Sequence, residues 1–256
     1  MNSSMTGAIR RPRTWRAILT TALARRPVAA ALTIAAGDVL IRVALQLGVQ
    51  ALIGPQWAEL VTLVILTALT LGLIALLGWW GPAGFNRPAA WRSPGLLWLP
   101  AALTFVLPFV AGFRGAELPM AGVFAVAYLL VGLREEALFR GVVLWALERL
   151  GPMGAAVLTS VLFGLTHLAN LFFRESPGLV LAQVVGAMTT GFGYAALRLR
   201  TNTLWPLIVL HAFEDLTLHY SNLPVIPIQV IRGVTLVIYG AWLLRGWNVE
   251  NQEETR

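Results

Sequence analysis

Three short groups of ionisable side chains interrupt the apolar second half of this sequence. The first runs from Arg134 to Arg140, the second ends at His167, and the third runs from His211 to Asp215. Ionisable side chains within a bilayer are costly, so they tend to face a cavity or one another. Histidines and carboxylates brought together can bind a metal ion or carry out general acid–base chemistry. The sequence therefore predicts one reactive site built from these groups.

The first group has the spacing of a helix. Glu136 and Arg140 are four residues apart, so their side chains can pair on one helix face. The adjacent Glu135 projects about 100° away from that face. We therefore predict that Arg140 neutralises Glu136 and that Glu135 is the available carboxylate. The alternative is a helix end whose charges face water, an interpretation that we favour for Glu148 and Arg149.

The two histidine groups together favour a functional site more strongly than either does alone. A lone His167 in an apolar helix is as often a packing residue as a functional one. His211 and Asp215, however, are four residues apart, which puts an imidazole and a carboxylate on one face of a third helix. Glu214 is ambiguous, and His219 near the helix end is expected to be solvated.

The elements that must position these groups are membrane helices. Hydrophobic residues make up 57% of the chain and charged residues 12%, whereas soluble domains have about 45–50% and 25%. The apolar residues form runs of roughly 18 or more, the length at which an α-helix crosses a bilayer. We predict an all-α, polytopic transmembrane helix bundle with about eight spans. The predicted spans are residues 28–53, 58–80, 96–113, 119–148, 153–173, 178–197, 203–220 and 224–244.

Arginines predict the orientation of these spans. With the amino terminus inside, thirteen arginines fall in cytoplasmic segments and only Arg114 and Arg174 fall outside. The thirteen are Arg10, Arg11, Arg13, Arg16, Arg25, Arg26, Arg87, Arg92, Arg149, Arg198, Arg200, Arg245 and Arg256. We expect an integral protein of a prokaryotic plasma membrane with both termini cytoplasmic. Most arginines are scattered one or two per loop, and the dense cluster before the first apolar run is an orientation signal, so no nucleic-acid partner is expected.

Two further patterns carry local predictions. Asp38 and Arg42 are one helical turn apart in the first span and are predicted to pair, since an uncompensated charge in lipid is costly. The stretch Gly191-Phe192-Gly193 lies in an apolar run and indicates close helix packing rather than phosphate binding. The absence of cysteine excludes disulfides and thiolate metal sites.

Taken together, the three groups resemble the CPBP family of intramembrane proteases. This family, also called Abi, includes CAAX prenyl endopeptidases and bacteriocin-processing or bacteriocin-immunity proteins. The resemblance covers about residues 119–220, and the first three predicted helices show no family signature. The motifs that carry it are Glu135-Glu136-x-x-x-Arg140, Phe163-x-x-x-His167 and His211-x-x-x-Asp215.

The resemblance implies a role for each motif. Glu135 resembles the general base of the family, and His167 the histidine that helps to hold and activate water. His211 and Asp215 correspond to the pair that binds metal or stabilises the oxyanion. The candidate catalytic residues are Glu135, Glu136, Arg140, His167, His211 and Asp215.

The cofactor has two alternatives. If a metal is present, we expect Zn²⁺ with His167, His211, Glu135 and Asp215 as ligands; the other alternative is a metal-independent glutamate mechanism. Where many family members have asparagine, this chain has Asp215. An ionised aspartate cannot donate a hydrogen bond to an oxyanion. Asp215 therefore ligates a cation, orients His211, or is protonated.

The expected function is endopeptidase activity within the lipid bilayer. The substrates would be membrane-associated peptides or membrane proteins, including prenylated or precursor peptides. The alternatives are a non-catalytic immunity or maturation factor with the same fold and a proton-coupled transporter, for which buried ionisable groups are also typical. Because hydrolysis consumes water and Glu135 lies in the inward-running half of its span, we expect the site to lie towards the cytoplasmic side.

We divide the chain into four segments. Residues 1–27 form a basic cytoplasmic segment, and residues 28–113 hold three transmembrane helices. Residues 119–220 form the CPBP/Abi-like catalytic core. Residues 221–256 hold the last transmembrane helix and a short polar cytoplasmic tail.

Overall fold

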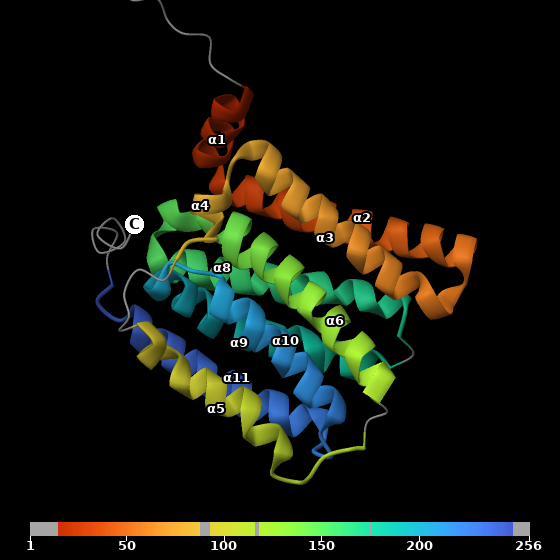
Figure 1. Cartoon of the computed structure of the whole chain (residues 1–256). Coiled ribbons are helices and arrows are strands. Elements are labelled where there is room, and N and C mark those ends of the chain that lie inside the picture. Colours follow the sequence, from red (N-terminus) through yellow and green to blue (C-terminus); the bar gives the residue numbers. More distant parts are fainter. Residues whose placement is uncertain (1–14, 88–92, 116–117, 175, 248–256) are drawn as a thin grey trace, which may run out of the picture.

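All regular elements in the described part of the chain are helices (Figure 1). The computed structural model describes residues 15–87, 93–115, 118–174 and 176–247. Residues 1–14 of the predicted basic segment and 248–256 of the predicted tail lie outside these ranges. The prediction of an all-α bundle is confirmed. The longer elements are α1 (Trp15–Arg25), α2 (Pro27–Ile53), α3 (Pro55–Leu77), α5 (Trp98–Phe105), α6 (Leu118–Glu135), α8 (Gly151–Thr166), α9 (Pro177–Thr201), α10 (Trp205–Tyr220) and α11 (Val225–Leu244).

Short elements complete the chain between these helices. The segment after α6 is a π-helix, η3, which leads into α7 and the 3₁₀ turn η4; a second 3₁₀ segment, η5, follows α8. The short elements are α4 (Trp80–Ala83), η1 (Ser93–Leu97), η2 (Leu107–Phe109), η3 (Glu136–Val143), α7 (Leu144–Leu147), η4 (Glu148–Leu150) and η5 (His167–Phe172).

Five helical stretches among the described residues are long and apolar enough to cross a membrane. Four are α2, α3, α9 and α11, and the fifth is the continuous stretch Pro119–Phe172. That stretch reverses at Gly151, whose φ of 76° is favourable only for glycine, so α6 and α8 run in opposite directions (Figure 1). The predicted spans 96–113 and 203–220 correspond to shorter helices. The count of eight spans therefore stays a prediction.

Glycines set the closest approaches between helices. α9 packs against α8 on one side and against α11 on the other. A Cβ atom on Gly193 of α9 would lie 3.0 Å from the backbone oxygen of Leu236 on α11. Small residues let membrane helices approach backbone to backbone. The interpretation of Gly191-Phe192-Gly193 as a packing element is confirmed.

The crossing of α6 and α10 depends on Gly132. A Cβ atom there would lie 2.7 Å from the backbone oxygen of Ile208 and 3.5 Å from the Cβ atom of His211. We expect Gly132→Ala to push the two helices apart and to cost about 1–3 kcal/mol of stability, the usual penalty of overpacking. Thermal unfolding in detergent measures this loss. Gly122→Ala is the matched control, because nothing lies within 4 Å of a Cβ at that position of α6; equal melting temperatures for the two variants would contradict the prediction.

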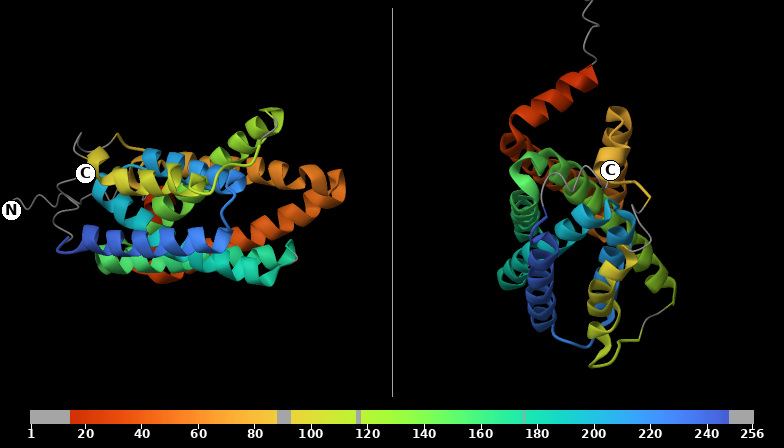
Figure 2. Two further views of the ribbon diagram at one scale, coloured as in Figure 1. Left: turned by 90° about the horizontal axis from the view of Figure 1, so that it is seen from below. Right: turned by 90° about the vertical axis from the view of Figure 1, so that its left-hand side faces the viewer.

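The bundle has two distinct ends. α1 and the carboxy-terminal end of α11 lie toward the same end, which we call the proximal end (Figure 2). The tip of the α2–α3 hairpin, the start of α6 and the α8–α9 connection lie at the other, which we call the distal end (Figure 2). At the distal end the α2–α3 hairpin diverges from the other helices, whereas α8, α9 and α11 stay packed together.

Candidate active site

The two adjacent glutamates stand where α6 changes into the π-helix η3. π-helical turns are rare, wider than α-helical turns, and frequent at functional sites. Arg140 Nη1 donates to Glu136 Oε1 at 3.0 Å, and both side chains are almost completely buried. The predicted pairing of Glu136 and Arg140 is confirmed. Glu135 takes no part in this ion pair, and 12% of its side-chain surface is exposed.

Arg140 is enclosed by aromatic rings as well as by Glu136. Its guanidinium carbon lies 4.1 Å from the ring centre of Phe163 and 5.9 Å from that of Tyr194, both within the range of cation–π attraction. A Cβ atom on Gly191 would lie 2.8 Å from Arg140 Nη2. The glycine on α9 therefore makes room for the buried guanidinium.

His211 connects the two glutamates. Its Nδ1–H donates to Glu136 Oε1 at 2.7 Å. This hydrogen bond places the proton on Nδ1 and leaves Nε2 facing the other carboxylates. Nε2 lies 3.7 Å from Glu135 Oε2 and 3.8 Å from Asp215 Oδ2. Glu136 is thus a buried support that orients His211 toward Glu135.

His167 lies beside this group at the junction of α8 and η5. Its Nδ1–H donates to the backbone oxygen of Phe163 at 3.0 Å, so Nε2 is the nitrogen left for a water molecule or ligand. The Phe163 ring packs edge-on against both imidazoles, with ring centres 4.9 Å from His167 and 6.2 Å from His211. Glu135 and both histidines line one cavity. The tertiary structure therefore brings the three predicted motifs together.

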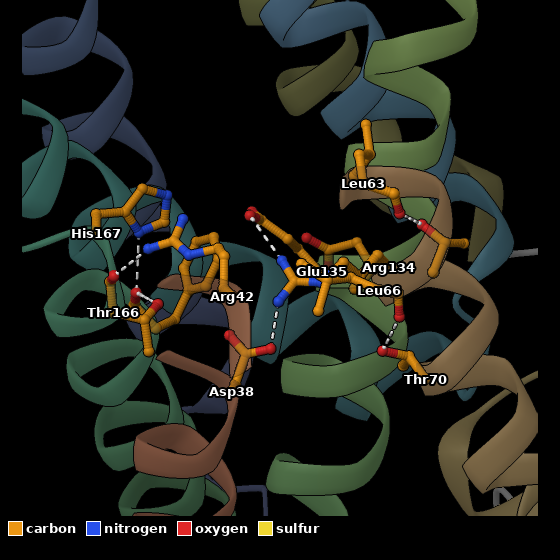
Figure 3. Close-up of polar contacts among 12 residues, drawn as sticks. Asp38, Arg42, Leu63, Leu66, Thr70, Arg134, Glu135, Thr166 and His167 are labelled. Carbon is orange, nitrogen blue, oxygen red and sulfur yellow. Dashed lines mark hydrogen bonds and ion pairs between the residues drawn. The ribbon is translucent and has the colours of Figure 1, made fainter. Parts of the chain in front are cut away.

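Asp38 and Arg42 do not pair with each other, so that prediction is wrong. Asp38 forms an ion pair with Arg134 of α6 (Figure 3). Arg42 Nη2 donates to the backbone oxygen of Thr166 at 2.7 Å, and Nη1 donates to Asn170 Oδ1 at 3.4 Å. The partners instead come from other elements, namely α6 for Asp38 and, for Arg42, the α8–η5 junction against which α2 packs.

Helix α2 therefore contributes to the site, although it lies outside the predicted catalytic core. Arg134 Nη1 stands 3.7 Å from Glu135 Oε1, so Arg134 lies between Asp38 and the Glu135 carboxylate. Figure 3 shows Glu135 extending from α6 toward the side on which Arg42 and His167 lie. The sequence signal for these residues was the presence of Asp38 and Arg42 in an apolar span, because charges in lipid mark functional or paired positions.

The ambiguous Glu214 has a structural role. Arg232 Nη1 of α11 lies 2.6 Å from Glu214 Oε1, and the Tyr194 hydroxyl donates to Glu214 Oε2 at 3.0 Å. These contacts tie α9, α10 and α11 together. Asp215, on the next position of α10, is the carboxylate that approaches His211.

A cavity of about 570 Å³ leads away from these residues. Glu135, His167, His211 and Asp215 line its inner part. Its other lining residues include Arg114 and others from the distal connections, with no proximal connection among the described residues that line it. The cavity thus extends toward the distal end. The expectation that the site lies toward the cytoplasmic side stays a prediction.

The residues fit a metal ion only in part. His167 and His211 each donate from Nδ1 to an acceptor, as is usual for metal-ligating histidines. Two ligands of one tetrahedral Zn²⁺ would lie about 3.3 Å apart, whereas His211 Nε2 is 3.7 Å from Glu135 and 3.8 Å from Asp215. Within the described ranges, no group of three or more His, Cys, Asp or Glu residues is arranged to hold a metal ion. Zn²⁺ binding stays a prediction.

Comparison with known proteins identifies the central segment. Residues 117–217 match the family model described as type II CAAX prenyl endopeptidase Rce1-like. All six candidate catalytic residues fall within this segment, whereas Asp38 and Arg42 precede it. Neither the curated proteins nor the solved structures include a match to the chain.

Proposed function

We propose that the chain is an intramembrane endopeptidase in which Glu135 activates water, and the match of residues 117–217 to the family model of type II CAAX prenyl endopeptidases supports this. The observation that carries this proposal is the distance of 3.7 Å between Glu135 Oε2 and His211 Nε2 at the inner part of the cavity. A water molecule that makes hydrogen bonds of about 2.8 Å can contact both atoms. The site therefore has a base, a second group to hold the water, and space for a substrate.

The proposed reaction uses Glu135 twice. Glu135 accepts a proton from the water while the water oxygen forms a bond to the scissile carbonyl carbon. The carbonyl electron pair moves onto its oxygen and gives a tetrahedral intermediate. When the C–N bond breaks, Glu135 returns the proton to the leaving amine. His211 and His167 hold the attacking water through Nε2, and the hydrogen bond to Glu136 keeps His211 in the required tautomer.

The proposed substrates are membrane-associated peptides, including prenylated or precursor peptides. The cavity volume of about 570 Å³ lies within the range of ligand pockets, roughly 300–1,000 Å³. Arg42, Arg134 and Arg140 line the cavity together with the carboxylates. Arg134 and Arg140 are already paired with carboxylates. Arg42 donates to a backbone oxygen and to an amide instead, so its charge can favour a developing oxyanion.

Hydrolysis can be tested directly with water labelled with ¹⁸O. Purified protein in detergent would be incubated with a peptide library, and mass spectrometry would show whether each new carboxy terminus carries ¹⁸O. We expect incorporation with the wild type and with the control Glu148→Gln, but not with Glu135→Gln. Peptide binding without cleavage would replace the proposal by the non-catalytic alternative. Loss of cleavage with a chelator, restored by Zn²⁺, would show that the reaction uses a metal.

Asp215 offers a test of what the third motif does. Asparagine can donate a hydrogen bond to an oxyanion but is a poor ligand for Zn²⁺. For the metal-independent reaction we expect Asp215→Asn to keep kcat within a few-fold of wild type, and Asp215→Leu to lower it about tenfold or more. Steady-state kinetics of the two variants measures this difference. A loss in Asp215→Asn that added Zn²⁺ repairs would assign Asp215 to metal binding instead.

A further inference from the structure

The cavity reaches only one end of the bundle. Beyond the catalytic group, its lining includes Glu59 near the α2–α3 tip, Arg114 before α6, Arg174 after η5, and Leu223 between α10 and α11. Arg114, Arg174 and Leu223 belong to distal connections, and Glu59 lies near the start of α3 at the same end. The proximal connections, such as that at Arg149, contribute no described residue to the lining. Water and substrate therefore have their route to Glu135 from the distal end.

The distribution of arginines predicts which side of the membrane the distal end faces. Among the described residues, the distal connections hold Arg114 and Arg174 alone. The described arginines at the proximal end are Arg16, Arg25, Arg26, Arg87, Arg149, Arg198, Arg200 and Arg245. Cytoplasmic segments carry the excess of arginine in membrane proteins. The distal end is therefore predicted to face away from the cytoplasm. Both distal arginines line the cavity.

We propose that the cavity takes its substrate from the extracytoplasmic side. The substrate is then a peptide segment of an exported or membrane-anchored protein at the outer face of the membrane, which narrows the proposed substrates to those that reach this face. That the peptide in the cavity is a substrate rests on the proposed function. The side of access rests on independent observations, namely the residues that line the cavity and the asymmetry of the arginines.

The absence of cysteine from the chain makes the side of access measurable. Single cysteines would be introduced by Arg174→Cys at the distal mouth, Gln183→Cys within the cavity, and Arg149→Cys at the proximal end as the control. Cells that express each variant would be treated with a membrane-impermeant, charged maleimide before and after permeabilisation. We expect Arg174→Cys and Gln183→Cys to be labelled in intact cells, and Arg149→Cys only after permeabilisation.

Every outcome of the labelling bears on the proposal. Labelling of Arg149→Cys but not Arg174→Cys in intact cells would overturn it, because the distal end would then be cytoplasmic. Failure of Gln183→Cys to react even after permeabilisation would also overturn it, because the cavity would not be connected to water. The labelling does not depend on turnover, so repeating it with Glu135→Gln separates the two proposals. If Glu135→Gln still cleaves peptides while labelling is external, the proposed function fails and the side of access stands.

Discussion

Replacing Glu135 by glutamine is expected to lower turnover by about 10²–10⁴-fold, the usual contribution of a general base. Glutamine keeps the shape of the side chain but cannot accept the proton of the attacking water. Peptide binding should change little, because Glu135 acts in the chemical step. The loss should therefore appear in kcat rather than in KM. Initial rates over a range of peptide concentrations give both constants.

Two comparisons test whether the effect is chemical. Glu148→Gln removes a carboxylate near the proximal end and should retain wild-type rates and melting temperature. Glu135→Gln should also melt near the wild-type temperature, because Glu135 is not the partner of Arg140. A loss of less than tenfold, or a loss that parallels unfolding, would remove Glu135 from the role of base.

Replacing Arg140 by alanine is expected to damage both folding and activity. Glu136 has no exposed surface, and its Oε1 accepts hydrogen bonds from Arg140 and His211. Removing one partner of a buried pair leaves the other charge uncompensated, at a cost of about 3–5 kcal/mol. The substitution also removes the guanidinium that lies over the Phe163 ring, and this ring contacts both imidazoles. Thermal unfolding in detergent and the cleavage rate measure the two effects.

A pair of variants separates stability from catalysis at this position. Arg140→Leu combined with Glu136→Leu removes both charges, and we expect it to be more stable than Arg140→Ala, because no unpaired charge is left. Its activity should nevertheless stay low, because His211 loses the acceptor that orients it. Arg149→Ala, an exposed arginine at the proximal end, is the control and should change neither property. Recovery of activity in the double variant would show that Glu136 has no positioning role.

Helix α2 is part of the candidate site, although it lies outside the predicted catalytic core. Asp38 pairs with Arg134, and Arg42 donates to Thr166 and Asn170 beside His167. These contacts cross from α2 to α6 and to the α8–η5 junction, so the matched segment 117–217 contains only part of the polar network. Helix α2 therefore helps to position the site, although it carries no recognisable motif.

The sequence by itself determined the class of the molecule and the pairs that lie within one helix. Runs of apolar residues specify membrane helices whatever their neighbours are, because the bilayer is the solvent. The four-residue spacing specifies that Glu136 meets Arg140 and that His211 and Asp215 share a face, because helical geometry is local. Both pairs are present, with separations of 3.0 Å and 3.8 Å.

Only the tertiary structure decided which residues meet across helices. The partners of Asp38, Arg42 and Glu214 come from other helices, and a spacing along the chain carries no information about them. In a bilayer a charge pairs with whichever opposite charge or carbonyl the packing brings near. The same holds for access to Glu135. The cavity that leads to Glu135 is lined by residues of α2, α3, α6, α9 and α10, so no spacing along the chain predicts where it opens.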